Sequence, residues 1–311
     1  MKISKTLLVS LAFGAAVQGA SAQALQYNLP PRFPTAPKPS PRQIELQKKT
    51  DAGDVDAEAA LGWMYYDGEI QPMDALKAFQ LTQAAAEKGN VTAEDQLLTM
   101  YAQIGTPDDT EKALYWGRKA AGTGDQSSQI DLGKALQTYA STDEAYAEAI
   151  HWFEVAATGP NSDLAGRATL ALANTYAKGT GVKVDEGKAL YWLKQGVDKG
   201  SAESMNVLGL AYREGTGIDK DAKVSYKYFK ISANKGNAIG QDLLGDCYAN
   251  GVGTDVNLVK AFVWYTYASM NGSPKDFQKA NAVRSNMTDK DADAAMKIIQ
   301  HNSILSPTFD K

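Results

Sequence analysis

The stretch LGLAYREGTGI at residues 208–218 is followed by a similar stretch, LGDCYANGVG, at residues 244–253. This repetition is the main evidence for the fold. The first Leu of this pattern recurs along the chain at intervals of 35 to 40 residues. These anchor leucines are Leu61, Leu97, Leu132, Leu172, Leu208 and Leu244. A second anchor follows each Leu twenty residues later, at Leu81, Trp116, Trp152, Trp192, Tyr228 and Trp264. A period in the mid-thirties with two apolar anchors is typical of stacked helix–turn–helix repeats.

The spacing of apolar residues within a repeat is helical. Ala168, Leu172 and Tyr176 are four residues apart, which places them on one stripe of a helix. A Gly follows the anchor Leu in four of the six repeats, and its small size lets the second helix approach closely. Pairs such as Gly215 and Gly217 lie where the first helix must turn into the second. The sequence therefore predicts an all-α fold built from helical hairpins.

These residues resemble the Sel1-like repeat, a relative of the tetratricopeptide repeat. Its pattern is A-x-x-x-L-G-x-x-Y-x-x-G-x-G-(V/I), then K-A-x-x-W, then A-A-x-x-G. Matches in the last three repeats include Tyr176, Gly179, Gly181, Val182, Trp192, Gly209, Tyr212, Gly217, Ile218, Gly245, Tyr248, Gly253 and Trp264. The second and third repeats depart from the pattern: Leu98 replaces the Gly, Leu136 replaces the Tyr, and both lack Gly-x-Gly. We expect shorter or distorted loops there.

The resemblance implies a right-handed α-solenoid of about six repeats over residues 54–274. A solenoid needs capping elements that cover its apolar ends. Residues 42–53 are expected to form an N-terminal capping helix, and residues 275–301 the C-terminal capping helices. Thr288 and Asp291 predict a capping box at the start of the last helix. Residues 302–311 are expected to be a loose tail.

The N-terminus predicts export. Residues 1–22 have a basic start, a short apolar run and an Ala-Ser-Ala site, which together indicate a signal peptide cut after Ala22. The apolar run is shorter than the roughly 20 residues of a membrane span, although an uncleaved anchor is the rival interpretation. Removing residues 1–22 takes away two Lys and no acid, which changes the net charge from −4 to −6. The expected location is therefore periplasmic or secreted, and an acidic chain is a poor nucleic-acid binder.

Residues 23–41 form a linker rich in proline, with six of the chain's eleven prolines between residues 27 and 42. Proline fixes φ and has no N–H, so an extended polyproline-like conformation is expected. The linker is interpreted as a spacer, with a docking peptide for an aromatic groove as the alternative.

The sequence offers few groups for catalysis or metal binding. One Cys and two His supply neither a zinc ligand set nor a compact nucleophile–base pair. Cys247 is expected to be a small buried apolar residue, and His151 a structural side chain of a second helix. Asp242 and Asp246, one helical turn apart, are more typical of a solvated face than of a carboxylate pair for glycoside cleavage. We therefore expect no catalytic residues, no cofactor and no metal.

A partner is expected on one face of the first helices. Residues five or two positions before the anchor Leu, and two or five after it, lie opposite the core stripe. In the related repeats that face lines the concave groove. The predicted partner-binding residues are Asp56, Trp63, Tyr66, Arg167, Asn174, Asn206, Arg213, Asp242 and Asp246. Trp63 is informative because Trp, Tyr and Arg dominate interface hot spots, but packing against the leading helix or the linker explains it equally well.

The resemblance implies a non-enzymatic scaffold that binds a protein or peptide partner in its groove. Exported relatives act as signalling regulators or as immunity proteins that neutralise toxins. An alternative from another class is a weak β-lactam hydrolase or cell-wall ligand binder, although the disulfides of the cysteine-rich relatives are absent here. A structural adaptor in the cell envelope is a third possibility. No transmembrane span is expected in the mature chain.

Overall fold

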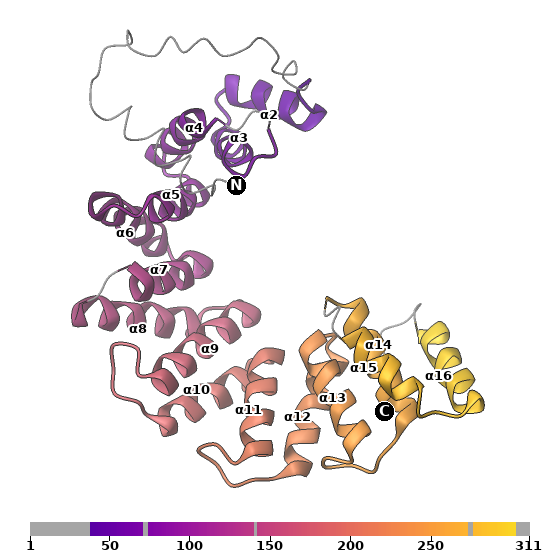
Figure 1. Cartoon of the computed structure of the whole chain (residues 1–311). Coiled ribbons are helices and arrows are strands. Elements are labelled where there is room, and N and C mark those ends of the chain that lie inside the picture. Colours follow the sequence, from indigo (N-terminus) through magenta and orange to yellow (C-terminus); the bar gives the residue numbers. More distant parts are fainter. Residues whose placement is uncertain (1–37, 71–73, 140–141, 273–275, 303–311) are drawn as a thin grey trace, which may run out of the picture. The chain divides into compact units, whose positions relative to one another are not determined.

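The computed structural model describes residues 38–70, 74–139, 142–272 and 276–302. Within these ranges the chain forms fifteen helices and no strand, so the all-α solenoid predicted from the sequence is confirmed (Figure 1). The helices are α2 Pro41–Asp51, α3 Val55–Asp67, α4 Ala75–Glu87, α5 Val91–Ile104, α6 Pro107–Gly122, α7 Gln126–Tyr139, α8 Asp143–Thr158, α9 Ser162–Lys178, α10 Glu186–Asp198, α11 Ala202–Glu214, α12 Ala222–Asn234, α13 Ala238–Asn250, α14 Leu258–Met270, α15 Asp276–Arg284 and α16 Asp289–Asn302.

The described helices group into two compact halves, which divide between residues 152 and 153. In each half, pairs of helices joined by one connection pack against each other, for example α3 with α4 and α13 with α14. The first helices of successive repeats also contact each other: α3 contacts α5, and α11 contacts α13. The first helices therefore form a continuous layer within each half.

Local sequence signals explain where the helices begin and end. Side chains of Asp54, Asn90 and Ser201 each accept a hydrogen bond from a backbone N–H in the first turn of the following helix. Gly215 and Gly251 end their helices in the left-handed region, at φ 79° and 71°. At the last helix the backbone N–H of residue 291 donates to the Thr288 hydroxyl, as the capping box predicts.

The departures in the second and third repeats have the expected effect on the loops. Only two residues separate α5 from α6, and three separate α7 from α8. The fourth repeat, which has the Gly-x-Gly, uses seven residues between α9 and α10. The connections in the second and third repeats are therefore shorter, as expected, and α5 still packs against α6.

The core is the seam predicted from the anchor leucines. All six anchor leucines have no exposed surface, and Phe153, Phe229 and Trp264 are the largest buried side chains in the described residues. The C-terminal cap completes this core with Ala280 of α15, Ile299 of α16 and Met287 of the connection between them. Burial at the first anchor explains why the same apolar residue, Leu, recurs there in all six repeats.

Close helix packing depends on the glycine beside the anchor leucine, and this gives a first prediction. A Cβ added at Gly209 would lie 2.6 Å from the Phe229 ring, closer than carbon atoms can approach. We expect Gly209→Ala to lower the free energy of unfolding by about 1–2 kcal/mol through overpacking. Urea denaturation followed by circular dichroism measures this.

Gly122→Ala is the matched control, because a Cβ at Gly122 meets nothing within 4 Å. That substitution should be neutral or slightly stabilising, since Ala has the higher helix propensity. Equal destabilisation by both variants would contradict the close-packing explanation for Gly209.

No helix in the described ranges is both long and apolar enough to cross a membrane. The expected signal peptide, most of the proline-rich linker and the tail from residue 303 lie outside the described residues.

Candidate functional site

A recess of about 450 Å³ lies on the predicted face of the first helices in the N-terminal half. Helix α3 provides most of its wall, α5 provides the opposite wall, and α2 contributes at one end. The lining residues are Arg42, Asp56, Ala59, Ala60, Trp63, Met64, Glu69, Asn90, Thr92 and Gln96. The structure therefore places two predicted residues, Asp56 and Trp63, in one recess.

Trp63 is the aromatic side chain among the residues that line this recess, and it is half-buried. Its ring centroid lies 5.2 Å from that of Tyr66, another predicted residue, with the two planes tilted by 40°. An ion pair of 3.2 Å between Arg42 and Glu69 lies at one end of the recess. Arg42 belongs to the leading helix, so that helix contributes to the recess while Trp63 keeps part of its surface open.

Three polar atoms on this face are buried without a hydrogen-bond partner: the Tyr66 hydroxyl, Asp95 Oδ1 and Gln96 Oε1. Burial raises the pKa of Tyr66 to about 12, with a further contribution from Tyr139. Burial also raises the pKa of Asp95 to about 6, and the nearby negative charges of Asp131 and Asp125 add to the effect. The face thus holds acceptor atoms that the chain itself leaves unsatisfied.

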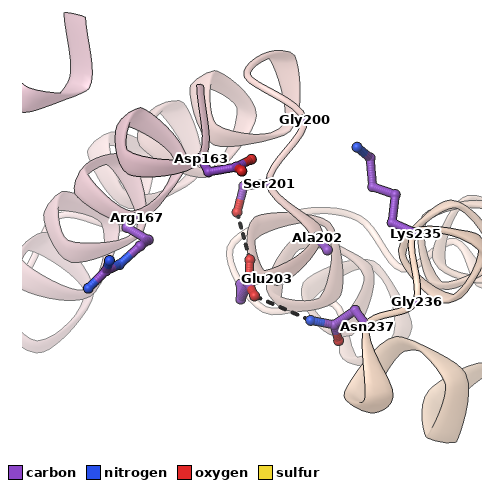
Figure 2. A pocket seen from close by; sticks show the side chains of 9 residues that line it. All are labelled: Asp163, Arg167, Gly200, Ser201, Ala202, Glu203, Lys235, Gly236 and Asn237. Atoms are coloured by element: carbon purple, nitrogen blue, oxygen red, sulfur yellow. Dashed lines mark hydrogen bonds between the residues drawn. The ribbon is translucent and has the colours of Figure 1, made fainter. Parts of the chain in front are cut away.

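A second recess, of about 360 Å³, lies at the equivalent place in the C-terminal half (Figure 2). Arg167, one of the predicted residues, lines it together with Glu203 and Asn237, and the Asn237 amide donates to Glu203 at 3.3 Å. Figure 2 shows the Arg167 guanidinium pointing away from Glu203. Asn174, farther along α9, is exposed.

The structure does not present every predicted residue to solvent. Asn206 is only 3% exposed and donates to Asn237 at 2.9 Å, so it is part of the packing between repeats rather than an open surface. Arg213 is half-buried, with its guanidinium 5.8 Å from the Phe229 ring centroid. The simple helical offsets missed these contacts because they ignore the other helices packed beside each first helix.

Asp242 and Asp246 already have a cationic partner. The Lys279 ammonium, from the capping helix α15, lies 2.5 Å from Asp242 Oδ1 and 3.1 Å from Asp246 Oδ1. Tyr265 also donates to Asp246 at 2.7 Å. This pair of carboxylates therefore ties the last repeat to the cap.

Cys247 and His151, which were considered as candidates for catalysis, do not lie in a catalytic arrangement. Cys247 is buried, and burial raises the pKa of its thiol to about 12, which disfavours the reactive thiolate. His151 is exposed and packs edge-on against Trp152. Among the described residues, no three His, Cys, Asp or Glu side chains gather in a metal-binding group.

Asp95 is not among the predicted residues, although the helical offsets from the anchor Leu include its position. Asp95 lies two positions before the anchor Leu97, the same offset that was used in other repeats. The offsets identify the face, but the unsatisfied Oδ1 and the raised pKa appear only when α7 packs beside α5.

A comparison with known protein families identifies repeats in the same part of the chain. A family model described as Sel1 repeat matches six segments: residues 55–90, 100–125, 127–161, 166–201, 202–237 and 238–273. The chain is 25% identical over 187 residues to the uncharacterized protein NMB1327 of Neisseria meningitidis, which covers 60% of this chain and 37% of that protein. It is 28% identical over 148 residues to the Sel1-repeat-containing protein YjcO of Escherichia coli, which covers 48% and 63% respectively. The chain thus spans less than two thirds of either relative.

Solved structures agree on the fold. A protective antigen of uropathogenic Escherichia coli strains, described as having an SLR fold, is similar with a TM-score of 0.56 and 26% identity, over 78% of this chain and 51% of that one. A Sel1 repeat protein from Oxalobacter formigenes gives a TM-score of 0.51 and 21% identity, over 79% and 88%. Together with the six matched segments, this shows that the chain belongs to the Sel1 repeat family.

Proposed function

We propose that this chain is an exported, non-enzymatic scaffold that binds a protein or peptide partner on the face of its first helices. Sel1 repeats are generally protein-interaction scaffolds, and the finer assignment to a signalling regulator or a toxin-neutralising immunity protein is part of this proposal. Export rests on the N-terminal sequence pattern.

The observation that carries the proposal is the half-buried Trp63 in its recess. Interface hot spots combine a large aromatic surface with surrounding polar groups that exclude water. Trp63 has such surroundings, since Ala59, Ala60 and Met64 give an apolar wall and Asp56 and Asn90 give a polar rim. A partner side chain that fills the recess would bury the rest of the indole ring.

The test is affinity capture with the mature chain, followed by measurement of the affinity for the captured partner. We expect Trp63→Ala to weaken binding about tenfold, equivalent to about 1.4 kcal/mol. Tyr115→Ala is the control, because Tyr115 is 59% exposed on the second helix α6 of the same half. Binding that is insensitive to Trp63→Ala, or that depends on Tyr115 instead, would place the partner elsewhere.

A further inference from the structure

The Trp63 recess lies close to the point where the proline-rich part of the chain enters the fold. Arg42, the second residue of α2, lines one end of the recess and forms an ion pair of 3.2 Å with Glu69. The name proline segment is used below for residues 30–37, PPRFPTAP, which lie outside the described residues and end five positions before Arg42. The proline segment is therefore tethered at the rim of the recess.

The chain before α2 is long enough to reach along the whole recess. The recess follows α3 from Asp56 near its start to Glu69 just beyond its end, and a helix of this length extends about 20 Å. Residues 23–37 span roughly 45 Å in a polyproline conformation. Ser40, which caps α2, has φ −66° and ψ 155°, close to polyproline values. The proline segment can therefore fold back over α3 whichever way it leaves α2.

The recess offers the chemistry that proline-rich segments bind. Such segments dock in grooves lined by aromatic side chains, and a polyproline helix loses little entropy on binding because it is already extended. Trp63 provides a half-buried indole, and the Tyr66 ring packs against it with a centroid distance of 5.2 Å. Thr92 and Gln96 line the recess with a hydroxyl and an amide, which can donate to carbonyl groups of the segment. Prolines suit such a site because they have no N–H that needs an acceptor.

The charges of the two parts are complementary. Residues 23–44 contain three Lys and Arg and no Asp or Glu. Residues 45–152, the rest of the N-terminal half, contain eight Lys and Arg against nineteen Asp and Glu, a net charge of −11. Asp56 at the rim is exposed, and its hydrogen-bond partner, the Asn90 amide at 2.6 Å, is neutral. The folded half therefore attracts the basic stretch that carries the proline segment.

We propose that the proline segment occupies the Trp63 recess of its own chain, with proline rings against the indole and Arg32 directed towards Asp56. The tether gives the segment an effective concentration on the order of millimolar at the recess, so weak docking is sufficient to keep it there. A partner that binds at Trp63 must then displace the segment. This consequence rests on the proposed function and makes the segment a regulator of that site.

The first experiment follows Trp63 in the full mature chain labelled with 5-fluorotryptophan. The chain has five Trp residues, and the fluorine NMR signal that is missing from Trp63→Phe belongs to Trp63. In the four-proline variant, each proline of the proline segment is changed to Ala. We expect this variant to shift the Trp63 signal and to leave the other four signals in place. Pro160→Ala, at an exposed position in the other half, is the matched control and should shift none of them.

Three results of this experiment would overturn the proposal. An unchanged Trp63 signal in the four-proline variant would show that the segment does not occupy the recess. Comparable shifts of all five signals would show a general change in the fold instead of a local contact. A Trp63 signal that moves with protein concentration would show that the segment docks on a second copy of the chain.

A synthetic peptide with the sequence of residues 28–37, NLPPRFPTAP, tests the same contact between separate molecules. Titration calorimetry should detect its binding to the four-proline variant, and adding Trp63→Ala to that variant should abolish the binding. The natural chain should bind the peptide about fivefold more weakly if its own segment leaves the recess open about one fifth of the time, because the apparent Kd rises as the open fraction falls. Equal binding to both chains, or binding to neither, would contradict the proposal.

The inference and the proposed function fail in different ways. A captured partner that loses affinity on Trp63→Ala, but binds the natural chain and the four-proline variant equally, would leave the function standing and reject the segment as its regulator. A captured partner that is insensitive to Trp63→Ala, together with a Trp63 signal that shifts in the four-proline variant, would reject the proposed binding site and leave the docked segment standing. Partner binding that is about fivefold tighter in the four-proline variant would support both.

Discussion

Replacing Trp264 by Ala should lower the free energy of unfolding by about 3–5 kcal/mol, the largest effect expected from any single side chain of the repeats. Trp264 lies on α14 with none of its surface exposed. It belongs to a core cluster that includes Leu244 and Tyr248 of α13 and Ala295 of α16. Removal of the indole would leave a cavity between the last repeat and its cap, where rigid helices on several sides limit collapse.

Urea denaturation of the mature chain measures this effect, with Trp192→Ala as the matched control. Trp192 has the same place in the fourth repeat but is only half-buried on α10. Folding removes less apolar surface from water at Trp192 than at Trp264. Trp192→Ala should therefore be clearly less destabilising than Trp264→Ala. Comparable losses from both variants, or a loss under about 1 kcal/mol from Trp264→Ala, would show that burial at this position does not determine stability.

The fold was predictable because the repeat places the same physical requirement at the same interval. A Leu that must be buried between two helices recurs at every anchor, and all six anchors are fully buried in the structure. The absence of Gly-x-Gly from the second and third repeats also predicted the shorter connections found there. These requirements are local, so they could be recognised in the sequence of this one chain.

The candidate site was predictable only in part, because it depends on contacts between repeats. Helical offsets selected Asp56 and Trp63, which line one recess in the structure. They could not show that Asn206 is hydrogen-bonded to the next repeat, or that Lys279 of the cap forms ion pairs with both Asp242 and Asp246. Such pairs lie 31 to 37 residues apart in sequence, and no local pattern links them.

The second large effect concerns Asp95, whose replacement by Asn should stabilise the chain by about 2 kcal/mol at pH 7. Burial holds the pKa of Asp95 at about 6, above its ordinary 3.8, so the folded state binds this proton more tightly than the unfolded state. Stability from this group is therefore fully present below pH 4 and is lost as the pH rises to about 6. A shift of two pKa units corresponds to nearly 3 kcal/mol, which residual solvent screening reduces to about 2.

The pH dependence of this stabilisation distinguishes an effect of charge from an effect of packing. Asn does not titrate, so the gain of Asp95→Asn over the natural chain should be near zero at pH 4, grow between pH 4 and 6, and stay constant above that. Glu111→Gln, exposed on α6, should change the free energy of unfolding by less than about 0.5 kcal/mol at every pH. A gain that is already present at pH 4 would assign the effect to shape or packing instead of charge.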